Sequence, residues 1–324
     1  MSQHFLLSAK ARTLSLASVM RMTALEAETV FRAVRWDEGK AICPHCGCPT
    51  VYECRRPSGA LRFRCKACRK DFSITSGTLF AFHKMPLRQY LAAIAIFVNE
   101  VKGKSALALS RDLDCQYKTA FVLAHKLREA MAFELKGMRV GGEGETVEID
   151  GGYFGGYVKP ANHRENRRDR RLAKNQNGKR QVVVVVKERG GRTVPAVFNA
   201  EVDAMGFIVQ RVSPVSRIVV DEASSWNALH AGFDVARIDH GKLYSDGSGV
   251  YTNGAEEFFS RMRRAEIGHH HHIAGRYLVR YAQESAWRED YRRVANGQQV
   301  KAVAGLAMLA PTSVDWCGYW QRAN

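Results

Sequence analysis

The chain has 324 residues, enough for two or three domains with a substantial core. Its apolar content of 46% is ordinary for a globular protein, but its formal net charge is +17 and its pI is near 9.7. This charge favours a polyanionic partner, and the longest apolar run, residues 91–98, is too short to span a bilayer. We therefore expect no membrane partner.

The N-terminal segment, residues 1–40, is expected to be helical, because apolar residues recur at helical spacing from residue 16 onward. The first 25 residues contain Lys10, Arg12 and Arg21 and no acid, a composition that a transit peptide can share. Nothing else in the chain supports that alternative. We therefore expect a protein of the reducing cytoplasm.

Residues 41–75 contain a cysteine cluster with the spacing of a zinc ribbon. Cys43 and Cys46 form one Cys-x-x-Cys turn, and after eighteen residues Cys65 and Cys68 form a second. Four thiolates from two such turns can close a tetrahedron around zinc and leave no open position for a substrate. The sequence therefore predicts one structural Zn²⁺. We expect that Cys48 and Cys54 do not bind it. His45 is an alternative ligand, but its position inside the first turn favours an outward-facing side chain.

Residues 85–135 are predicted to form a helical DNA-binding region. The stretch 85–100 is predominantly apolar and indicates a buried helix. Residues 104–131 contain an amphipathic helix, a break near Asp114 and a second helix, which is the order of a helix-turn-helix. The basic residues of the second helix that we take as candidate DNA contacts are Lys118 and Lys126.

The pattern changes after residue 145, where a mixed α/β domain is predicted over residues 145–293. Four strand-like segments with β-branched runs are separated by glycine-rich turns. One more short strand is expected within residues 234–247, and two helical segments follow residue 253. The tail, residues 294–324, has no clear pattern.

Two of the predicted strands end in a carboxylate: TVEID ends at Asp150, and SRIVVD ends at Asp221. Glu256 follows thirty-five residues later, near the start of a helix. Carboxylate oxygens suit Mg²⁺ or Mn²⁺, and two such ions can activate the attacking oxygen and stabilise the leaving oxygen in phosphoryl transfer. The three acids therefore form a candidate catalytic site, although Asp221 could instead cap the helix that follows it.

These motifs together resemble a bacterial insertion-sequence transposase of the DDE type. The resemblance covers residues 20–293 and rests on VEIDGGYFGG, NRRDRRLAKNQNGKR, VVDEASSW, TNGAEEFFSRMRR and GHHHHIAGRYLVRYAQESAWR. It implies a zinc ribbon and a helix-turn-helix region, followed by an RNase-H-like (ISXO-like) catalytic domain with a mixed sheet and flanking helices. It also implies divalent-metal catalysis that cuts and joins transposon ends.

The resemblance assigns roles to individual residues. Asp150 and Asp221 become the first two catalytic acids, and the third catalytic residue is either Glu256 or Asn253. We prefer Glu256, because a carboxylate is the better metal ligand. Arg263 lies seven residues after it on the same helix face, where its guanidinium can hold a DNA phosphate.

Two polar segments remain open to more than one interpretation. Residues 159–180 contain nine Lys or Arg and two acids, so they form either a solvated loop or, as their place after the first catalytic strand favours, a contact to the nucleic-acid backbone. The run His269–His272 is interpreted as a loop near DNA or the active site, not as a metal site. The candidate DNA contacts in the first segment are Arg167, Arg168, Arg170 and Arg171.

The partners that the resemblance implies are transposon ends, target DNA and further copies of the chain, since such enzymes usually act on paired ends. It also implies a nucleoid-associated protein of the bacterial cytoplasm. One alternative is an RNase-H-fold nuclease with the same acids but no end specificity. Another is a non-catalytic zinc-ribbon DNA-binding regulator, against which the acids at the strand ends argue.

Overall fold

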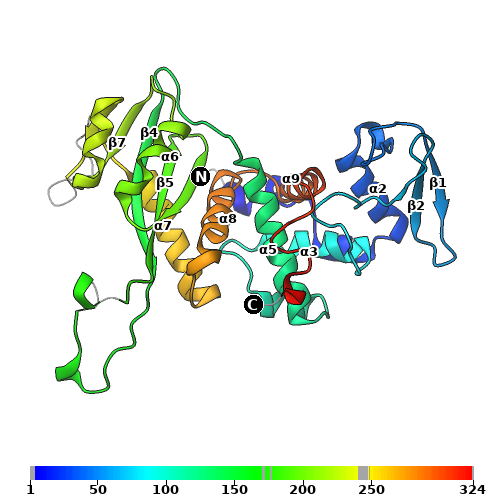
Figure 1. Cartoon of the computed structure of the whole chain (residues 1–324), viewed down its shortest axis with the longest axis horizontal. Coiled ribbons are helices and arrows are strands. Elements are labelled where there is room, and N and C mark those ends of the chain that lie inside the picture. Colours follow the sequence, from blue (N-terminus) through cyan, green and yellow to red (C-terminus); the bar gives the residue numbers. More distant parts are fainter. Residues whose placement is uncertain (1–3, 170–171, 176, 240–246, 248, 323–324) are drawn as a thin grey trace. The chain divides into compact units, whose positions relative to one another are not determined.

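The computed structural model describes residues 4–322 except 170–171, 176, 240–246 and 248 (Figure 1). The chain divides into two compact units. The first unit combines the chain up to Glu134 with the chain from Tyr291 onward, and the second is Leu135–Asp290. Among the described helices, none has the length and apolar character needed to cross a membrane.

The zinc ribbon of the first unit is a small antiparallel sheet. Phe63 stacks on Phe72 with ring centroids 5.2 Å apart, and Trp36 meets Phe63 edge-on at 5.4 Å. A sheet this small buries little apolar surface, so a metal crosslink would add to its stability. The strands, in sheet order, are β1 (Val51–Arg55), β2 (Leu61–Cys65) and β3 (Asp71–Phe72).

Helices form the rest of the first unit. The predicted N-terminal helical segment is divided at Thr23, because Thr23 Oγ1 accepts a bond from the Glu26 N–H and the Glu26 carboxylate accepts one from the Thr23 N–H, a capping box that starts a new helix. A break is present near Asp114, whose φ is 48°. The helices are α1 (Leu16–Arg21), α2 (Ala24–Arg35), α3 (Leu87–Asn99), α4 (Ala106–Asp112), α5 (Tyr117–Glu134) and α9 (Asn296–Leu309).

Helix α9 lies in the tail that showed no pattern in the sequence. It packs against α2, α3 and α5. Small and apolar residues surround most of its axis, as in the stretch AVAGLAML over residues 302–309. A helix with neighbours on several sides has no polar face, and therefore no amphipathic period to detect.

A five-stranded mixed sheet forms the centre of the second unit. Its order is β6-β5-β4-β7-β8, with β4–β5 and β5–β6 antiparallel and β4–β7 and β7–β8 parallel. The predicted mixed sheet with flanking helices is confirmed. The strands are β4 (Thr146–Gly155), β5 (Arg180–Glu188), β6 (Thr193–Phe198), β7 (Arg217–Val220) and β8 (Asp234–Arg237).

Apolar layers cover both faces of this sheet, which explains the unbroken valine run of β5. Val182, Val184 and Val186 pack in one cluster with α6 (Met205–Arg211). Val183 and Val185 pack in the other cluster, with α7 (Asn253–Ala265) and α8 (Leu278–Asp290). Helix α6, which the sequence did not predict, has seven residues and too few turns for a periodic pattern.

Candidate functional site

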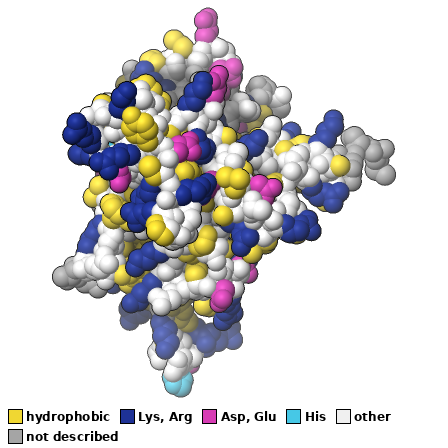
Figure 2. Space-filling view, turned by 90° about the vertical axis from the view of Figure 1, so that its right-hand side faces the viewer, with side chains coloured by type: hydrophobic (Ala, Val, Ile, Leu, Met, Phe, Trp, Pro, Cys, Tyr) yellow, Lys and Arg dark blue, Asp and Glu magenta, His cyan; other side chains and the backbone are white. Residues whose placement is uncertain are grey.

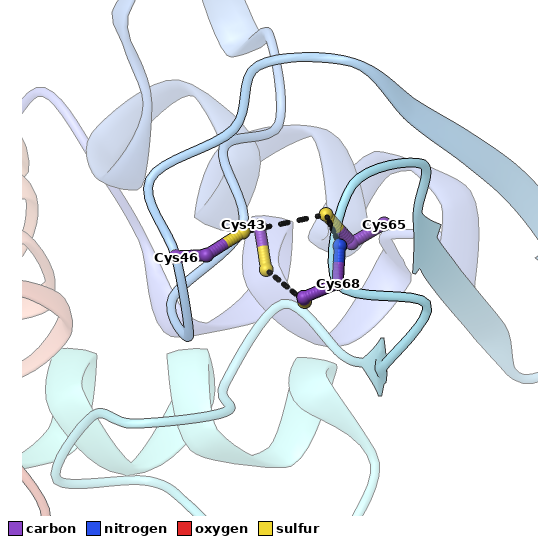
Figure 3. A group of neighbouring side chains, drawn as sticks. All are labelled: Cys43, Cys46, Cys65 and Cys68. Atoms are coloured by element: carbon purple, nitrogen blue, oxygen red, sulfur yellow. Dashed lines mark hydrogen bonds between the residues drawn. The ribbon is translucent and has the colours of Figure 1, made fainter.

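Four cysteine thiols meet in the zinc ribbon (Figure 3). The Sγ atoms of Cys43, Cys46, Cys65 and Cys68 all lie within 4.8 Å of one another. Cys43 and Cys68 are 3.7 Å apart, and Cys46 and Cys65 are 3.6 Å apart. Four Zn–S bonds of about 2.3 Å at tetrahedral angles separate sulfurs by about 3.8 Å, so the cluster fits one zinc ion.

Two tight backbone turns present these thiols. The Gly47 N–H donates to the Cys43 carbonyl at 2.9 Å, and the Arg69 N–H donates to the Cys65 carbonyl at 3.1 Å. Both donors have left-handed backbone, with φ of 74° at Gly47 and 58° at Arg69. The Cys68 N–H also donates to Cys65 Sγ at 3.4 Å, which lowers the pKa of that thiol and favours the thiolate that zinc binds.

The other potential ligands lie outside this cluster. The Cys48 thiol is 3.7 Å from the Thr50 carbonyl, and Cys54 and His45 are exposed. In the described part of the chain, no other set of three or more Cys, His, Asp or Glu ligand atoms is as close together as these four thiols. The histidine run His269–His272 therefore does not form such a set, and neither do the carboxylates of the second unit.

The register of two parallel strands relates the two predicted aspartates. Glu148 on β4 pairs with Val219 on β7. Continuing this register by two residues along each strand brings Asp150 beside Asp221, just beyond the last residue of β7. The structure thus places both acids just beyond the paired residues of β4 and β7. The prediction that a strand ends at the acid is right for β7, but it is wrong for β4, which continues past Asp150 to Gly155 because β5 pairs with it over that length.

Asp150 lies in a strongly acidic environment. Burial, and then the negative charges of Asp221, Glu201 and Glu256, raise the pKa of Asp150 to about 7. The N–H of Gly151 donates to Asp150 Oδ1 at 2.7 Å and opposes this shift in pKa. Four carboxylates therefore interact at this end of the sheet, and three of them are the predicted catalytic acids.

Asp221 is held by the segment that follows it. The Trp226 indole N–H donates to Asp221 Oδ1 at 2.8 Å, and the Ala223 N–H donates to the same oxygen at 3.1 Å. The alternative that Asp221 is the N-cap of the next helix is wrong, because the 3₁₀ helix at Ser224–Ala231 has Ala223 as its N-cap and no side-chain cap hydrogen bond. The bond from the Ala223 N–H instead closes a turn just before that helix. Neither bond uses Oδ2.

Glu256 is positioned by a second carboxylate on β4. Glu148 is buried, and its Oε2 accepts a bond of 3.0 Å from the Ala255 N–H in the first turn of α7. Its Oε1 accepts a bond of 2.8 Å from Arg189 Nε. A Cβ on Gly254 would lie 2.9 Å from Glu148 Oε2, so this close approach of strand and helix needs glycine. Glu148 was missed in the sequence because its partners come from distant segments.

The alternative third residue and the predicted phosphate contact also lie on α7. Asn253 is exposed at the first position of the helix, whereas Glu256 is half-buried and acts electrostatically on Asp150. Glu257, the next residue, is exposed and pairs with Arg261. Arg263 is exposed, with its guanidinium 5.8 Å from the Phe259 ring centroid.

Glu201 is a carboxylate of this site that the sequence analysis missed. It begins a short 3₁₀ helix, Glu201–Ala204, after β6, and Ser225 Oγ donates to its Oε2 at 2.8 Å. A Cβ on Gly151 would lie 2.5 Å from Glu201 Oε1, so glycine permits this approach to β4. The sequence contained a signal, because Glu201 follows the strand-like segment of β6 as Asp221 follows that of β7.

The predicted DNA-contacting residues belong to both units and differ in exposure. The described residues between β4 and β5, 156–179 except 170–171 and 176, belong to a long arm (Figure 1). Arg167 and Arg168 are exposed on it, and Arg167 Nε donates to the Ala161 carbonyl at 3.2 Å. Arg170 and Arg171 fall outside the described residues.

The two lysines of α5 differ in exposure. Lys118 is exposed, with its Nζ 5.3 Å from the Trp320 ring centroid. Lys126 is half-buried, and burial lowers its pKa. Lys118 is thus the more accessible of the two for a phosphate contact.

Comparison with known proteins adds two family matches. Residues 141–290 match the family described as "ISXO2-like transposase domain", and residues 23–71 match the one described as "Transposase zinc-ribbon domain". A Halobacterium salinarum protein described as "Uncharacterized protein in transposable element ISH50" is 23% identical over 291 residues, which cover 87% of this chain and 96% of the relative. No solved structure gives a significant match. The zinc-ribbon match and the thiol cluster together support a structural zinc.

Proposed function

Since the chain belongs to the insertion-sequence transposases with a zinc ribbon and an ISXO2-like DDE domain, we propose that it binds the terminal inverted repeats of its element, cuts the DNA there and joins the ends to target DNA. The observation that carries this proposal is the convergence of Asp221, Glu201 and Glu256 on Asp150. Such a concentration of acids in a chain of net charge +17 is suited to a divalent cation and a phosphate.

The donor set fits Mg²⁺ or Mn²⁺. Asp150, Asp221 and Glu256 offer carboxylate oxygens, the ligands that these ions prefer. Their mutual repulsion contributes to the raised pKa of Asp150, and a cation between them would offset it. When bound, the ions would supply activation of the attacking oxygen and stabilisation of the leaving oxygen.

The residues of the chain orient the reacting groups. Asp150 lies on β4 and Asp221 directly follows β7, and the Trp226 indole fixes the orientation of Asp221. Glu148 fixes the first turn of α7, which carries Glu256, and the negative charge of Glu256 acts on Asp150. Water would serve as the nucleophile for strand cleavage, and a 3′-hydroxyl would serve for strand transfer.

Glu256 is our choice for the third catalytic residue. Its burial and its electrostatic effect on Asp150 support the choice, as does the better affinity of carboxylate than amide oxygen for a divalent ion. Arg263, two helical turns further on, is proposed to hold a DNA phosphate. Asn253, exposed at the helix start, is the alternative.

Recognition of DNA is assigned to the basic surfaces of both units. We assign end binding to the zinc ribbon and the helix-turn-helix, with Lys118 and Lys126 as contacts, and backbone binding to the arm over residues 156–179. Because cutting and joining require two ends, we propose a homo-oligomer on DNA. Its substrate places it at the nucleoid in the cytoplasm.

The test compares single substitutions in the full-length, zinc-containing protein. Asp150→Asn, Asp221→Asn and Glu256→Gln should each abolish strand cleavage of a duplex that carries the element's end, while binding to that duplex persists. Glu257→Gln is the matched control, because it changes the adjacent exposed acid, and it should cleave normally. Normal cleavage by Glu256→Gln with none by Asn253→Ala would assign the third role to Asn253. Cleavage of any duplex without joining would identify a nuclease instead.

A further inference from the structure

Residues 81–85, which we call the Phe82 ridge, line two cavities of the first unit. The larger cavity, the ribbon groove, has a volume of about 1080 Å³ and is also lined by the zinc ribbon and the start of α3. The smaller cavity, the helix pocket, has a volume of about 340 Å³ and is also lined by α5 and residues 316–321. The ridge therefore lies between the zinc ribbon and the second helix of the helix-turn-helix.

Phe82 combines two unfavourable features. Its side chain is 82% exposed, so its ring gains little from burial in the folded chain. Its φ is 60°, in the left-handed region that residues with a Cβ rarely adopt. An exposed aromatic ring on a strained backbone points to a role in binding rather than in folding.

The residues around Phe82 hold it in place. Leu79, Phe80 and Ala81 are buried, and the Ala81 N–H donates to the Thr78 carbonyl at 3.0 Å. The Phe80 ring packs 4.8 Å from that of Tyr90 on α3. The ring of Phe82 is thus presented to solvent by a fixed segment, which lowers the entropy that binding would cost.

Basic side chains line both cavities beside the ridge. Two acids, Glu28 and Asp71, also line the ribbon groove, but Glu28 pairs with Arg55 at 2.8 Å. The helix pocket is lined by Lys118 and Lys126, and none of its described lining residues is acidic. Lys and Arg side chains are spread over the face shown in Figure 2. The basic residues of the ribbon groove are Arg55, Arg62, Lys84 and Arg88.

We propose that Phe82 is a wedge that packs against a DNA base step at the transposon end, with the ribbon groove and the helix pocket holding phosphates on either side of it. Apolar side chains that insert between base steps are a known means of binding duplex DNA, and basic residues beside such a wedge hold the backbone. This inference rests on the proposed binding of DNA ends and adds the residue that contacts the bases. The centres of interfaces between proteins are depleted in charged residues, whereas surfaces that bind DNA neutralise its phosphates with Lys and Arg. The basic residues of the two cavities therefore favour DNA over a second protein.

The experiment measures binding of the zinc-containing full chain to a duplex that carries the element's end, with 2-aminopurine placed in turn at successive positions. Phe82→Ala should weaken binding about tenfold, the loss typical of one base–aromatic contact, and should remove the fluorescence change at one position. The slope of log affinity against log salt should stay unchanged, because no charge is removed. Phe82→Trp should retain the affinity and the fluorescence change.

Three controls separate the possible causes. Val101→Ala changes another apolar side chain, 79% exposed and outside both cavities, and should bind as the wild type does. Phe82→Asn removes the ring while favouring left-handed backbone, so its weakened binding would exclude misfolding as the cause. Arg62→Ala should lower the salt slope by about one.

Wild-type affinity and fluorescence in both Phe82→Ala and Phe82→Asn would overturn the wedge and leave the proposed transposase function intact. If DNA binding is unchanged but the wild type is an oligomer that both Phe82 variants fail to form, the ridge would be assigned to contact between copies of the chain. A wild-type protein that does not distinguish the end duplex from a random duplex would instead contradict the proposed end recognition.

Discussion

The Trp226 indole N–H donates a bond of 2.8 Å to Asp221 Oδ1 and thereby joins the hydrophobic core of the second unit to a proposed catalytic carboxylate. Trp226 is fully buried, so its ring position is set by the packing of the core. Any change in that packing should therefore reach the orientation of Asp221.

Trp226→Phe tests this coupling. Loss of the hydrogen bond and of part of the ring should lower the free energy of unfolding by about 2 kcal/mol. The single-turnover rate of strand cleavage should fall by more than the loss of folded protein accounts for, while affinity for DNA stays unchanged. Trp287→Phe, at another fully buried indole of the same unit, is the control. Equal slowing in both variants would mean that the indole bond has no specific effect.

Zinc removal should unfold the ribbon. Purified protein should contain about one zinc ion per chain, and Cys65→Ser should lose it because three thiolates cannot close the tetrahedron. Cys48→Ser should keep its zinc, since the Cys48 thiol lies outside the cluster. Metal analysis and circular dichroism measure both effects. Stoichiometric zinc in Cys65→Ser would refute the ligand assignment.

Local patterns in the sequence were sufficient to predict the mixed sheet, the thiol cluster and the candidate acids Asp150 and Asp221. The valine run of β5 and the β-branched residues before Asp150 and Asp221 indicate strands, and two Cys-x-x-Cys turns define the thiol cluster. Each of these features needs only a few adjacent residues. That is why a single sequence predicts them.

Features that depend on distant pairing were not predictable in the same way. The positioning role of Glu148 depends on the contact between β4 and α7. The approach of Glu201 to β4 depends on glycine at position 151, where a Cβ would leave no room for the Glu201 carboxylate. Helix α9 lacks an amphipathic period because other helices surround it. The expectation that Asp221 could cap a helix also required the structure, in which Ala223 is the N-cap residue and Asp221 Oδ1 instead accepts bonds from the Ala223 N–H and the Trp226 indole.

The pH dependence of metal binding should follow from the raised pKa of Asp150, which is about 7 instead of 3.8. Below pH 7 a cation must displace a proton from Asp150, so Mg²⁺ affinity should fall about tenfold per pH unit. In the metal-free protein, the stability that the Asp150 proton contributes is full below pH 3.8 and is lost as the pH rises to about 7. Calorimetry at several pH values measures the affinity and the protons released.

Glu201→Gln is the matched variant for this effect. Removing its negative charge should lower the pKa of Asp150 and move the pH dependence of Mg²⁺ binding to lower pH. The substitution keeps an oxygen that can accept the bond from Ser225. An unchanged pH dependence would show that the charge of Glu201 does not act on Asp150.

Binding of the arm to DNA should be electrostatic. Arg167→Ala and Arg168→Ala should each lower the slope of log affinity against log salt by about one, because each removes one phosphate contact and the counterion released with it. Affinity for random and end-bearing duplexes should fall alike, since phosphate contacts do not read sequence.

Arg217→Ala is the control, because Arg217 is an exposed cation at the end of β7 opposite to Asp221. Fluorescence anisotropy over a range of salt gives the slopes. Unchanged slopes in the two arm variants would make the arm a solvated loop, and a lower slope in Arg217→Ala would show that the loss of any exposed cation has this effect.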